Sequence, residues 1–321
     1  MKRMLRSFLV IILIFASLPA QARAAELLIP VGKVIGLQLQ DDTVTVAAFD
    51  DSLGGLARDA GLKIGDEIVK VGETPVDCAQ DVRCALSRGG GESEITVRRN
   101  GKLSTLQITP RQTEDGPRIG VYLRQGIAGI GTVTFYDPDT GVFGTLGHGV
   151  SSAGGTLIDM TKGCAYEASV LSVRKGKCGE PGQLKGSAQD AVCGTLLRNT
   201  PQGVFGITNI PWKGEALPSA AFEEIRTGPA AIRSTVVGDT VREYSVEIMK
   251  IYPKDRPDGR NFLLKVTDPD LLAATGGIVQ GMSGSPILQD GKLVGAVTHV
   301  LVNSPDTGYG IFIGNMLDAA A

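Results

Sequence analysis

The chain has 321 residues, of which 42% are hydrophobic and 21% are charged. Its 32 basic and 34 acidic residues give a net charge of −2, which lacks the basic excess of a nucleic-acid-binding protein. The length suffices for one or two hydrophobic cores. The 43 glycines favour a turn-rich, mainly β chain over a helical one.

The first 25 residues predict a targeting segment. Lys2, Arg3 and Arg6 form a basic start, and residues 8–18 are an apolar run. Small residues at alternate positions of 20–24 are typical of a signal-peptide cleavage site. The run is shorter than the roughly 20 apolar residues that span a bilayer comfortably. We therefore expect export, with the segment either removed as a signal peptide or kept as a signal anchor that associates the protein with a membrane.

Residues 26–112 are expected to form the first folded domain. Residues 60–76 read A-G-L-K-I-G-D-E-I-V-K-V-G-E-T-P-V, in which glycine turns flank a short apolar strand. A helix is predicted from an N-cap at Asp77 to Gly89. The Asn-Gly pair at 100–101 predicts a tight turn between two strands. The region therefore predicts a small α/β unit.

This region resembles a PDZ domain of the bacterial protease type, through its G-L-x-x-G-D-x-I-x-x-V-x-G pattern and the order of its elements. PDZ domains bind an extended peptide, often a C-terminus, by adding it as a strand to a sheet edge. The resemblance implies a peptide-binding loop at Ile35, Gly36 and Leu37, with the helix after Asp77 as the other wall of the groove. The alternative is a domain that only packs against its neighbour and binds no peptide.

Residues 113–321 are expected to form the second domain, after a polar, proline-containing linker at 109–117. Short apolar or alternating runs follow, separated by Gly, Pro and Asp. This pattern predicts a β-barrel or sandwich rather than βαβ units. Two charged segments, 174–190 and 253–260, are expected as surface loops, and the first is long enough to shape substrate binding or to be self-cleaved.

Residues 281–286, G-M-S-G-S-P, have the composition of a nucleophilic loop. Glycines adopt backbone conformations that turn neighbouring N–H groups toward a developing oxyanion. The strand that follows resembles the one after the nucleophile of chymotrypsin-like serine peptidases. By that pattern Ser283 is the nucleophile and Ser285 is a small wall residue. An ordinary turn is the alternative interpretation.

The chain has only two histidines, and they differ in setting. His148 lies between two glycines in T-L-G-H-G-V, which favours presentation in a cleft, whereas His299 lies inside an apolar strand. His148 is therefore the predicted general base, which would take the proton of the Ser283 hydroxyl and return it to the leaving amine. A chymotrypsin-like double β-barrel would carry His148 on its first barrel and Ser283 on its second.

Five motifs occur in order behind the export signal and the PDZ-like region. They are G-T-V-T-F-Y-D-P at 131–138, G-T-L-G-H-G-V at 144–150, V-T-D-P-D-L-L at 266–272, T-G-G-I-V-Q-G-M-S-G-S-P-I at 275–287 and G-A-V-T-H-V at 295–300. Together they resemble the stage IV sporulation protein B (SpoIVB) peptidase family. The resemblance covers almost the whole chain after the targeting segment.

The resemblance implies an exported serine endopeptidase of endospore-forming bacteria. Members of that family act between forespore and mother cell, where they cleave a protein that regulates the release of a sigma factor, and they also process themselves. Two other functions stay open: a proteolytically silent PDZ adaptor that binds peptides, and a general extracytoplasmic protease of quality control. No cofactor is expected.

The same resemblance assigns the site. It implies a triad of Ser283, His148 and Asp268, in which the acid holds the imidazole tautomer. The alternatives left open are another acid and a simple capping role for Asp268 at the start of its Asp-Pro turn. The other acids considered are Asp190, Asp239 and Asp270.

The oxyanion hole is expected from the N–H groups of Ser283 and of Gly281 or Met282. His299 could line the primary specificity pocket, although packing is the favoured interpretation. The five cysteines are an odd number, which allows at most two internal pairs, and free buried thiols are expected. The histidines are too few for a convincing metal site, so none is predicted.

Overall fold

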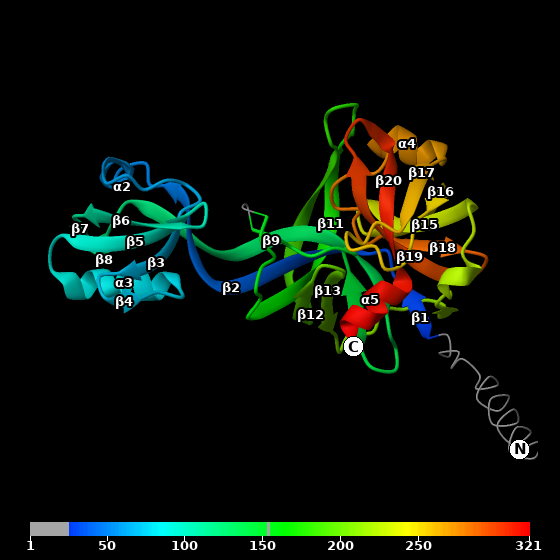
Figure 1. Cartoon of the computed structure of the whole chain (residues 1–321), viewed down its shortest axis with the longest axis horizontal. Helices are drawn as coiled ribbons and strands as arrows, with labels where there is room; N and C mark the ends of the chain where they lie inside the picture. Colours follow the sequence, from blue (N-terminus) through cyan, green and yellow to red (C-terminus); the bar gives the residue numbers. More distant parts are fainter. Residues whose placement is uncertain (1–25, 153–154) are drawn as a thin grey trace, which may run out of the picture.

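The computed structural model describes residues 26–152 and 155–321, so the predicted targeting segment lies outside the described residues. A larger body of two β-barrels carries a small domain at some distance, and two long strands, β2 (Val34–Phe49) and β9 (Val121–Tyr136), run from one to the other (Figure 1). The expected mainly β fold with a double β-barrel is confirmed.

The first barrel is a closed ring of six antiparallel strands within the described residues. Its interior holds large apolar side chains such as Leu39, Val133 and Phe143. The short strand β1 (Leu27–Pro30) extends this sheet by pairing with β9 on one side and with β14 (Leu217–Pro218) on the other. Around the ring the strands follow in the order β2, β9, β10 (Val142–Thr145), β13 (Gly203–Ile207), β12 (Gln183–Thr200) and β11 (Lys162–Arg174), which pairs with β2 again.

The second barrel is also a closed ring, and its apolar core is continuous with side chains from the first. Helix α4 (Pro269–Thr275) lies at one end of it, and the C-terminal helix α5 (Ile313–Ala320) packs against strands of both barrels. A short 3-10 helix, η1 (Phe222–Glu224), precedes the first strand of this barrel. The ring order is β15 (Gly228–Val237), β16 (Thr240–Ile251), β17 (Phe262–Val266), β20 (Ser304–Phe312), β19 (Lys292–Leu301) and β18 (Pro286–Gln289).

The small domain, residues 44–123, has an apolar core of its own. The predicted turn at Asn100 and Gly101 joins β5 to β6, with both residues in the left-handed region. The predicted helix is α3, but its N-cap is Cys78 rather than Asp77. The elements are α2 (Gly54–Asp59), β3 (Glu67–Val71), β4 (Thr74–Pro75), α3 (Ala79–Gly89), β5 (Ser93–Arg99), β6 (Lys102–Ile108), β7 (Arg111–Thr113) and β8 (Gly116–Arg118).

The small domain is inserted into the first barrel rather than placed before it. The chain enters it along β2 and leaves it along β9, which pair with each other in both parts of the molecule. Strand β1 and the first half of β2 therefore belong to the first barrel, and the expected boundary at residue 112 does not separate the two units. The expected linker at 109–117 contains β7 and most of the β7–β8 hairpin.

This insertion corrects the predicted peptide-binding loop. Ile35, Gly36 and Leu37 lie inside β2, where they pair with β9 on one side and with β11 on the other. Their position is therefore in the wall of the first barrel, and they cannot take up an added strand there.

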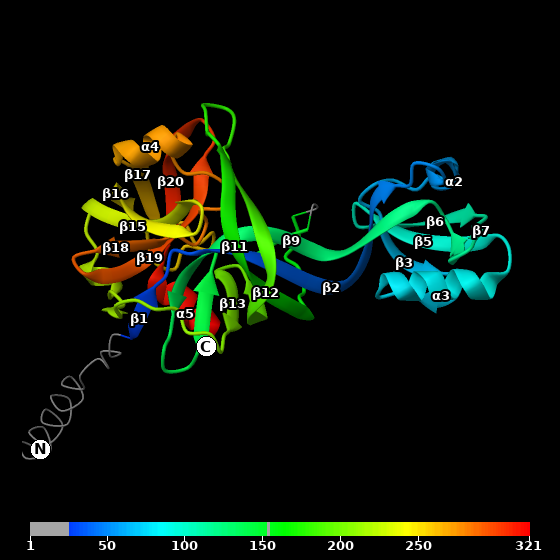
Figure 2. The ribbon, with the colours of Figure 1, turned by 180° about the vertical axis from the view of Figure 1, so that it is seen from behind.

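Two smaller expectations also change. Much of the segment 174–190 is strand β12, so only its first part forms the tip of the β11–β12 hairpin, which rises beside α4 (Figure 2). All five cysteines are free thiols, but only Cys193 is buried. Among the residues that the structure describes, no helix is long and apolar enough to cross a membrane.

Candidate active site

The segment that carries Ser283 lies between α4 and β18 and contacts both barrels. The Ser283 carbonyl accepts a hydrogen bond from the Thr132 N–H of β9 at 3.0 Å, and the Gly284 N–H donates to the Val297 carbonyl of β19 at 2.8 Å. Gly284 has φ of +96°, and a Cβ there would lie 2.0 Å from the Thr132 carbonyl oxygen. Only glycine fits this close approach, which fixes the segment at the junction of the barrels.

The tip of the β11–β12 hairpin supports the residues that precede Ser283. The Gly176 N–H donates to the Thr275 carbonyl at 2.8 Å. Further along, the Gln280 N–H donates to Gly182 at 3.0 Å, and the Leu184 N–H donates to Gln280 at 2.8 Å. The first barrel therefore holds the segment before the candidate nucleophile through its backbone.

The two serines of the motif have different surroundings. Ser285 is fully buried, and its hydroxyl donates to the Ser234 hydroxyl at 3.0 Å. Ser283 is only partly buried, and its hydroxyl donates to the backbone carbonyl of Thr298 at 2.7 Å. Of the two, Ser283 is the serine that solvent can reach.

His148 follows a tight turn at the end of β10. Leu146 and Gly147 have φ of 69° and 67°, a left-handed conformation that is costly for leucine and that recurs at functional sites. A Cβ on Gly147 would lie 2.9 Å from side-chain atoms of Ile311 and Thr298, so glycine lets the turn approach the second barrel closely. The turn places His148 at the junction of the barrels.

Among the residues that the structure describes, the His148 ring has one hydrogen-bond partner. Its Nδ1 lies 2.9 Å from the Gly149 carbonyl oxygen, and since a carbonyl only accepts, Nδ1 must carry the proton. Nε2 is then the unprotonated nitrogen, as a general base requires. Burial lowers the pKa of His148, partly offset by this hydrogen bond. The ring is consequently neutral near pH 7.

His299 lies next to His148, with ring centroids 5.1 Å apart and planes inclined by 41°. Burial is the main cause that lowers the pKa of His299 to about 4, and the positive charges of Arg260 and of His148 in its protonated form contribute. The structure thus brings Ser283 and His148 to two consecutive residues of β19, Thr298 and His299. No hydrogen bond joins Ser283 to His148 directly within the described chain.

Asp268 is not brought to His148. It is the N-cap of α4, where one carboxylate oxygen accepts from the Leu271 N–H at 2.9 Å and the other from the Ser245 N–H at 3.3 Å. This geometry matches the capping alternative and does not support a triad role. In the described part of the chain no carboxylate is hydrogen-bonded to His148. The three other acids considered are exposed: Asp190, Asp239 and Asp270.

The N–H groups expected to form the oxyanion hole divide into free and engaged ones. The Met282 N–H donates to the Val279 carbonyl at 3.1 Å, and the Met282 side chain is buried. Among the described residues, the N–H groups of Gly281 and Ser283 have no hydrogen-bond partner. The pair that remains available for the oxyanion is therefore Gly281 and Ser283. Gly281 has φ of +99°, a left-handed conformation that favours glycine.

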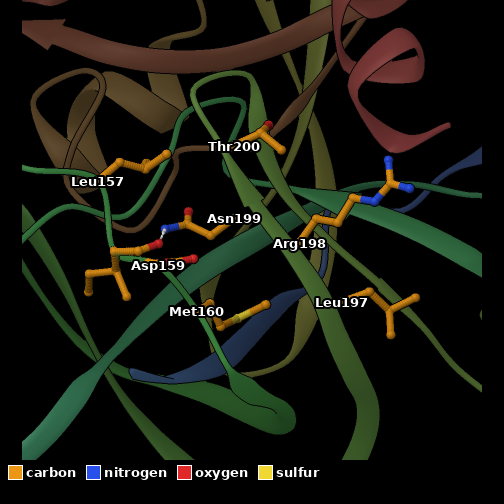
Figure 3. Close-up of a pocket in the computed structure, with 8 residues that line it drawn as sticks. Leu157, Asp159, Met160, Leu197, Arg198, Asn199 and Thr200 are labelled. Atoms are coloured by element: carbon orange, nitrogen blue, oxygen red, sulfur yellow. Dashed lines mark hydrogen bonds between the residues drawn. The ribbon is translucent and has the colours of Figure 1, made fainter. Parts of the chain in front are cut away.

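Asn199 was missed by the sequence analysis. Its Nδ2 donates to the carbonyls of Val150 at 2.8 Å and Ile158 at 2.9 Å, and its Oδ1 accepts from the Val150 N–H at 2.8 Å. The side chain thus holds both ends of the loop that follows His148. It lies at the wall of a cavity of about 450 Å³ between residues 157–160 and 197–200 (Figure 3). A single asparagine in a strand gives no local sequence signal for this role.

A second hollow, of about 370 Å³, lies in the small domain. Val82, Arg83 and Leu86 of α3 form one side, and residues 117–123 form the other. Gly120 has φ of +78°, and a Cβ there would lie 2.1 Å from the Leu53 carbonyl oxygen. The sequence Ile119-Gly120-Val121 has the same apolar-Gly-apolar pattern as residues 35–37. This second occurrence of the pattern is the sequence signal that could have pointed to the hollow in the small domain.

Comparison with known proteins bears on this geometry. Residues 115–317 match the family model of the SpoIVB peptidase S55. The chain belongs to this family. The S55 match includes both Ser283 and His148 and shows that the protein is a serine peptidase. It begins after β1 and β2, which the first barrel also needs.

Other similarities cover less of the chain. A Bartonella henselae protein named as a zinc metalloprotease is 29% identical over 98 residues, which are 29% of this chain and 27% of that relative. Among solved structures, the active form of the M. tuberculosis Rv3671c protease is 15% identical, with a TM-score of 0.37 over 61% of this chain and 73% of that one. Its inactive form has a TM-score of 0.35 over 61% and 85%.

Proposed function

We propose that the protein is a serine endopeptidase in which Ser283 is the nucleophile and His148 the general base. One observation carries this proposal: a solvent-accessible serine and a neutral histidine with a free Nε2 meet at the same two residues of β19, beside two unpartnered N–H groups. These are the parts that acyl transfer needs.

The first step is a rotation of the Ser283 side chain. In the resting arrangement its proton is held by the Thr298 carbonyl, so the hydroxyl must leave this acceptor and turn toward Nε2 of His148. His148 then takes the proton while the oxygen attacks the scissile carbonyl. The N–H groups of Gly281 and Ser283 receive the oxyanion, and His148 returns the proton to the leaving amine.

The Gly149 carbonyl fills the orienting role that the sequence analysis gave to Asp268. By accepting from Nδ1 it fixes the tautomer of His148, and Asn199 fixes the loop in which Gly149 lies. A neutral carbonyl stabilises an imidazolium less than a carboxylate does. We infer that His148 is a weaker base than one paired with an acid.

We also infer that the small domain is a PDZ-type module that recruits a peptide. The support is its groove between α3 and residues 117–123, which is lined by apolar side chains, by Arg83 and by the ion pair of Arg118 with Asp115. An extended peptide bound there would run beside the start of β9. Fluorescence anisotropy with labelled C-terminal peptides tests this, since Arg83→Glu should weaken binding whereas Arg88→Glu, an exposed position of the same helix outside the groove lining, should not.

The wider role proposed is that of an exported protease, secreted or held at a membrane by its first residues, that cleaves a signalling protein in a sporulation-type pathway and also processes itself. Residues 1–25 support export, and membership of the S55 family supports the pathway. Loss of sporulation on deletion of the gene, restored by the unmodified chain and not by Ser283→Ala, is the outcome expected. The rival roles are a silent adaptor and a quality-control protease.

Fluorophosphonate labelling of the purified chain, followed by mass mapping, tests the chemistry. The label should be found on Ser283 and should be lost in both Ser283→Ala and His148→Ala. Ser285→Ala is the matched control, because that hydroxyl is buried and bonded to Ser234. A folded sample that takes up no label, with or without a peptide in the groove, would favour the adaptor role.

A further inference from the structure

Two buried side-chain polar atoms in the described chain lack any hydrogen-bond partner, and they lie in one region. They are Nε of Arg260 and Nδ1 of His299. Native proteins satisfy the great majority of buried polar groups, so each exception calls for an explanation. Here both exceptions occur beside the candidate active site, which suggests that a ligand completes them.

The two residues are connected by an aromatic ring. The Arg260 guanidinium lies over Tyr309, 5.0 Å from the ring centroid, and Tyr309 pairs directly with His299 across β19 and β20. Side chains of directly opposed residues share one face of a sheet. The row continues to His148, whose ring is 5.1 Å from that of His299. Arg260, Tyr309, His299 and His148 thus form a continuous row that ends on the general base.

Arg260 has no acidic partner within the described residues, although an acid is close. Both carboxylate oxygens of Asp258 accept from the Arg256 guanidinium, at 2.6 and 2.9 Å, and one also accepts from the Arg260 backbone N–H at 3.1 Å. The Arg260 guanidinium itself makes no ion pair. A partly buried cation with an unused donor is costly unless a counter-charge arrives.

We propose that Arg260 and His299 bind the carboxylate of an acidic residue of the substrate, close to the scissile bond. This inference rests on the proposed endopeptidase function. The planar guanidinium offers parallel donors that match a carboxylate, and the neutral imidazole of His299 can add one N–H. Because the row ends on His148, the acidic residue lies near the bond that is cut. Arg260 is therefore a specificity-determining residue.

Cleavage of fluorogenic peptides tests the proposal. In a matched set, each position near the bond carries Glu, Gln or Lys in turn, and kcat/KM is measured for each peptide. The unmodified protein should prefer Glu over Gln by about tenfold or more at one position, as expected for a charge-assisted hydrogen bond. In Arg260→Gln this ratio should fall to about one.

Two further variants separate specificity from damage to the fold. Arg260→Glu should prefer Lys over Glu at the same position, a gain that misfolding cannot produce. Lys250→Gln is the matched control: Lys250 also lies over an aromatic ring, that of Tyr252, but outside the row, and its Glu-to-Gln ratio should match that of the unmodified protein.

The outcomes distinguish this inference from the function on which it rests. If Ser283 takes up no fluorophosphonate, the proposed function fails and this inference fails with it. If Ser283 is labelled but no position prefers Glu, or if Arg260→Gln keeps the preference, only the carboxylate site is overturned.

Discussion

The candidate nucleophile and the candidate base are held in place by different means. The segment 281–286 is bonded through its backbone to strands of both barrels, and Gly284 allows a contact that no side chain permits. The two ends of the loop that follows His148 are joined by one backbone hydrogen bond, from the Ile158 N–H to the Val150 carbonyl, and are held to β12 by the side chain of Asn199. Ser283 is therefore positioned by the fold as a whole, whereas His148 depends on a local set of hydrogen bonds.

The difference predicts different responses to substitution. Changes in the Ser283 segment should affect folding itself, because its contacts join the barrels. Changes around Asn199 should affect activity more than stability, because they release one loop. The following predictions test this contrast, beginning with the largest expected effect.

Gly284→Ala should destabilise the whole peptidase body. The added Cβ would lie 2.0 Å from the Thr132 carbonyl oxygen, in a left-handed backbone. We expect the free energy of unfolding in urea to fall by about 3 kcal/mol or more. Gly291→Ala is the matched control, since Gly291 has φ of +75° and nothing within 4 Å of its Cβ position. An equal loss in both variants would mean that the close approach to Thr132 does not matter.

Asn199→Ala should reduce activity strongly and stability weakly. Three hydrogen bonds to the loop after His148 disappear, and a displacement of the base by about 1 Å can cost on the order of a hundredfold in rate. The measurement is the rate of fluorophosphonate labelling of Ser283. Arg198→Ala, in the wall of the same cavity, should stay within about twofold of the unmodified rate. An Asn199→Ala variant that is labelled as fast as the unmodified protein would show that Asn199 does not position His148.

The pH dependence reports on the surroundings of His148. Burial lowers the pKa of His148, so the ring stays unprotonated down to pH values below the ordinary histidine pKa of about 6.5. Protonated His148 cannot act as a base, so kcat/KM should decline about tenfold per pH unit below that lowered pKa. A midpoint above 6.5 would instead indicate a carboxylate next to the ring.

Asp268 should behave as a helix cap. Asp268→Ala removes the acceptor for the Leu271 N–H, so the unfolding free energy should fall by about 1 kcal/mol. Asp268→Asn should recover most of that loss, because asparagine caps as well, and Ser283 should still be labelled. Loss of labelling in a stable Asp268→Asn variant would restore the triad assignment.

The parts of the site that sequence could predict are those with local causes. Ser283 and His148 lie in short glycine-rich patterns, and the backbone conformations that these glycines allow can be inferred from the sequence alone. The capping role of Asp268 is equally local, since Pro269 follows it at the first helical position and the Leu271 N–H is the group it satisfies. The resemblance to the family favoured the triad, and the local pattern favoured the cap.

The insertion of the small domain could not be predicted in the same way. Whether Ile35, Gly36 and Leu37 form a loop or a central strand depends on β9 and β11, which lie far along the chain. Asn199 likewise acts on Val150 and Ile158, about 40 to 50 residues away, and nothing near it in the sequence marks the contact. Both features are products of tertiary pairing.

The insertion also has a consequence for how the chain folds during synthesis. Strand β1 and the first half of β2 emerge early, but their partners include β11 and, near residue 217, β14. The small domain has a complete core once residue 123 has been made. We expect it to fold first and to hold β2 and β9 together as a paired stem. The edges of this stem stay unpaired until the remaining strands of the first barrel have been synthesised and can pair with them.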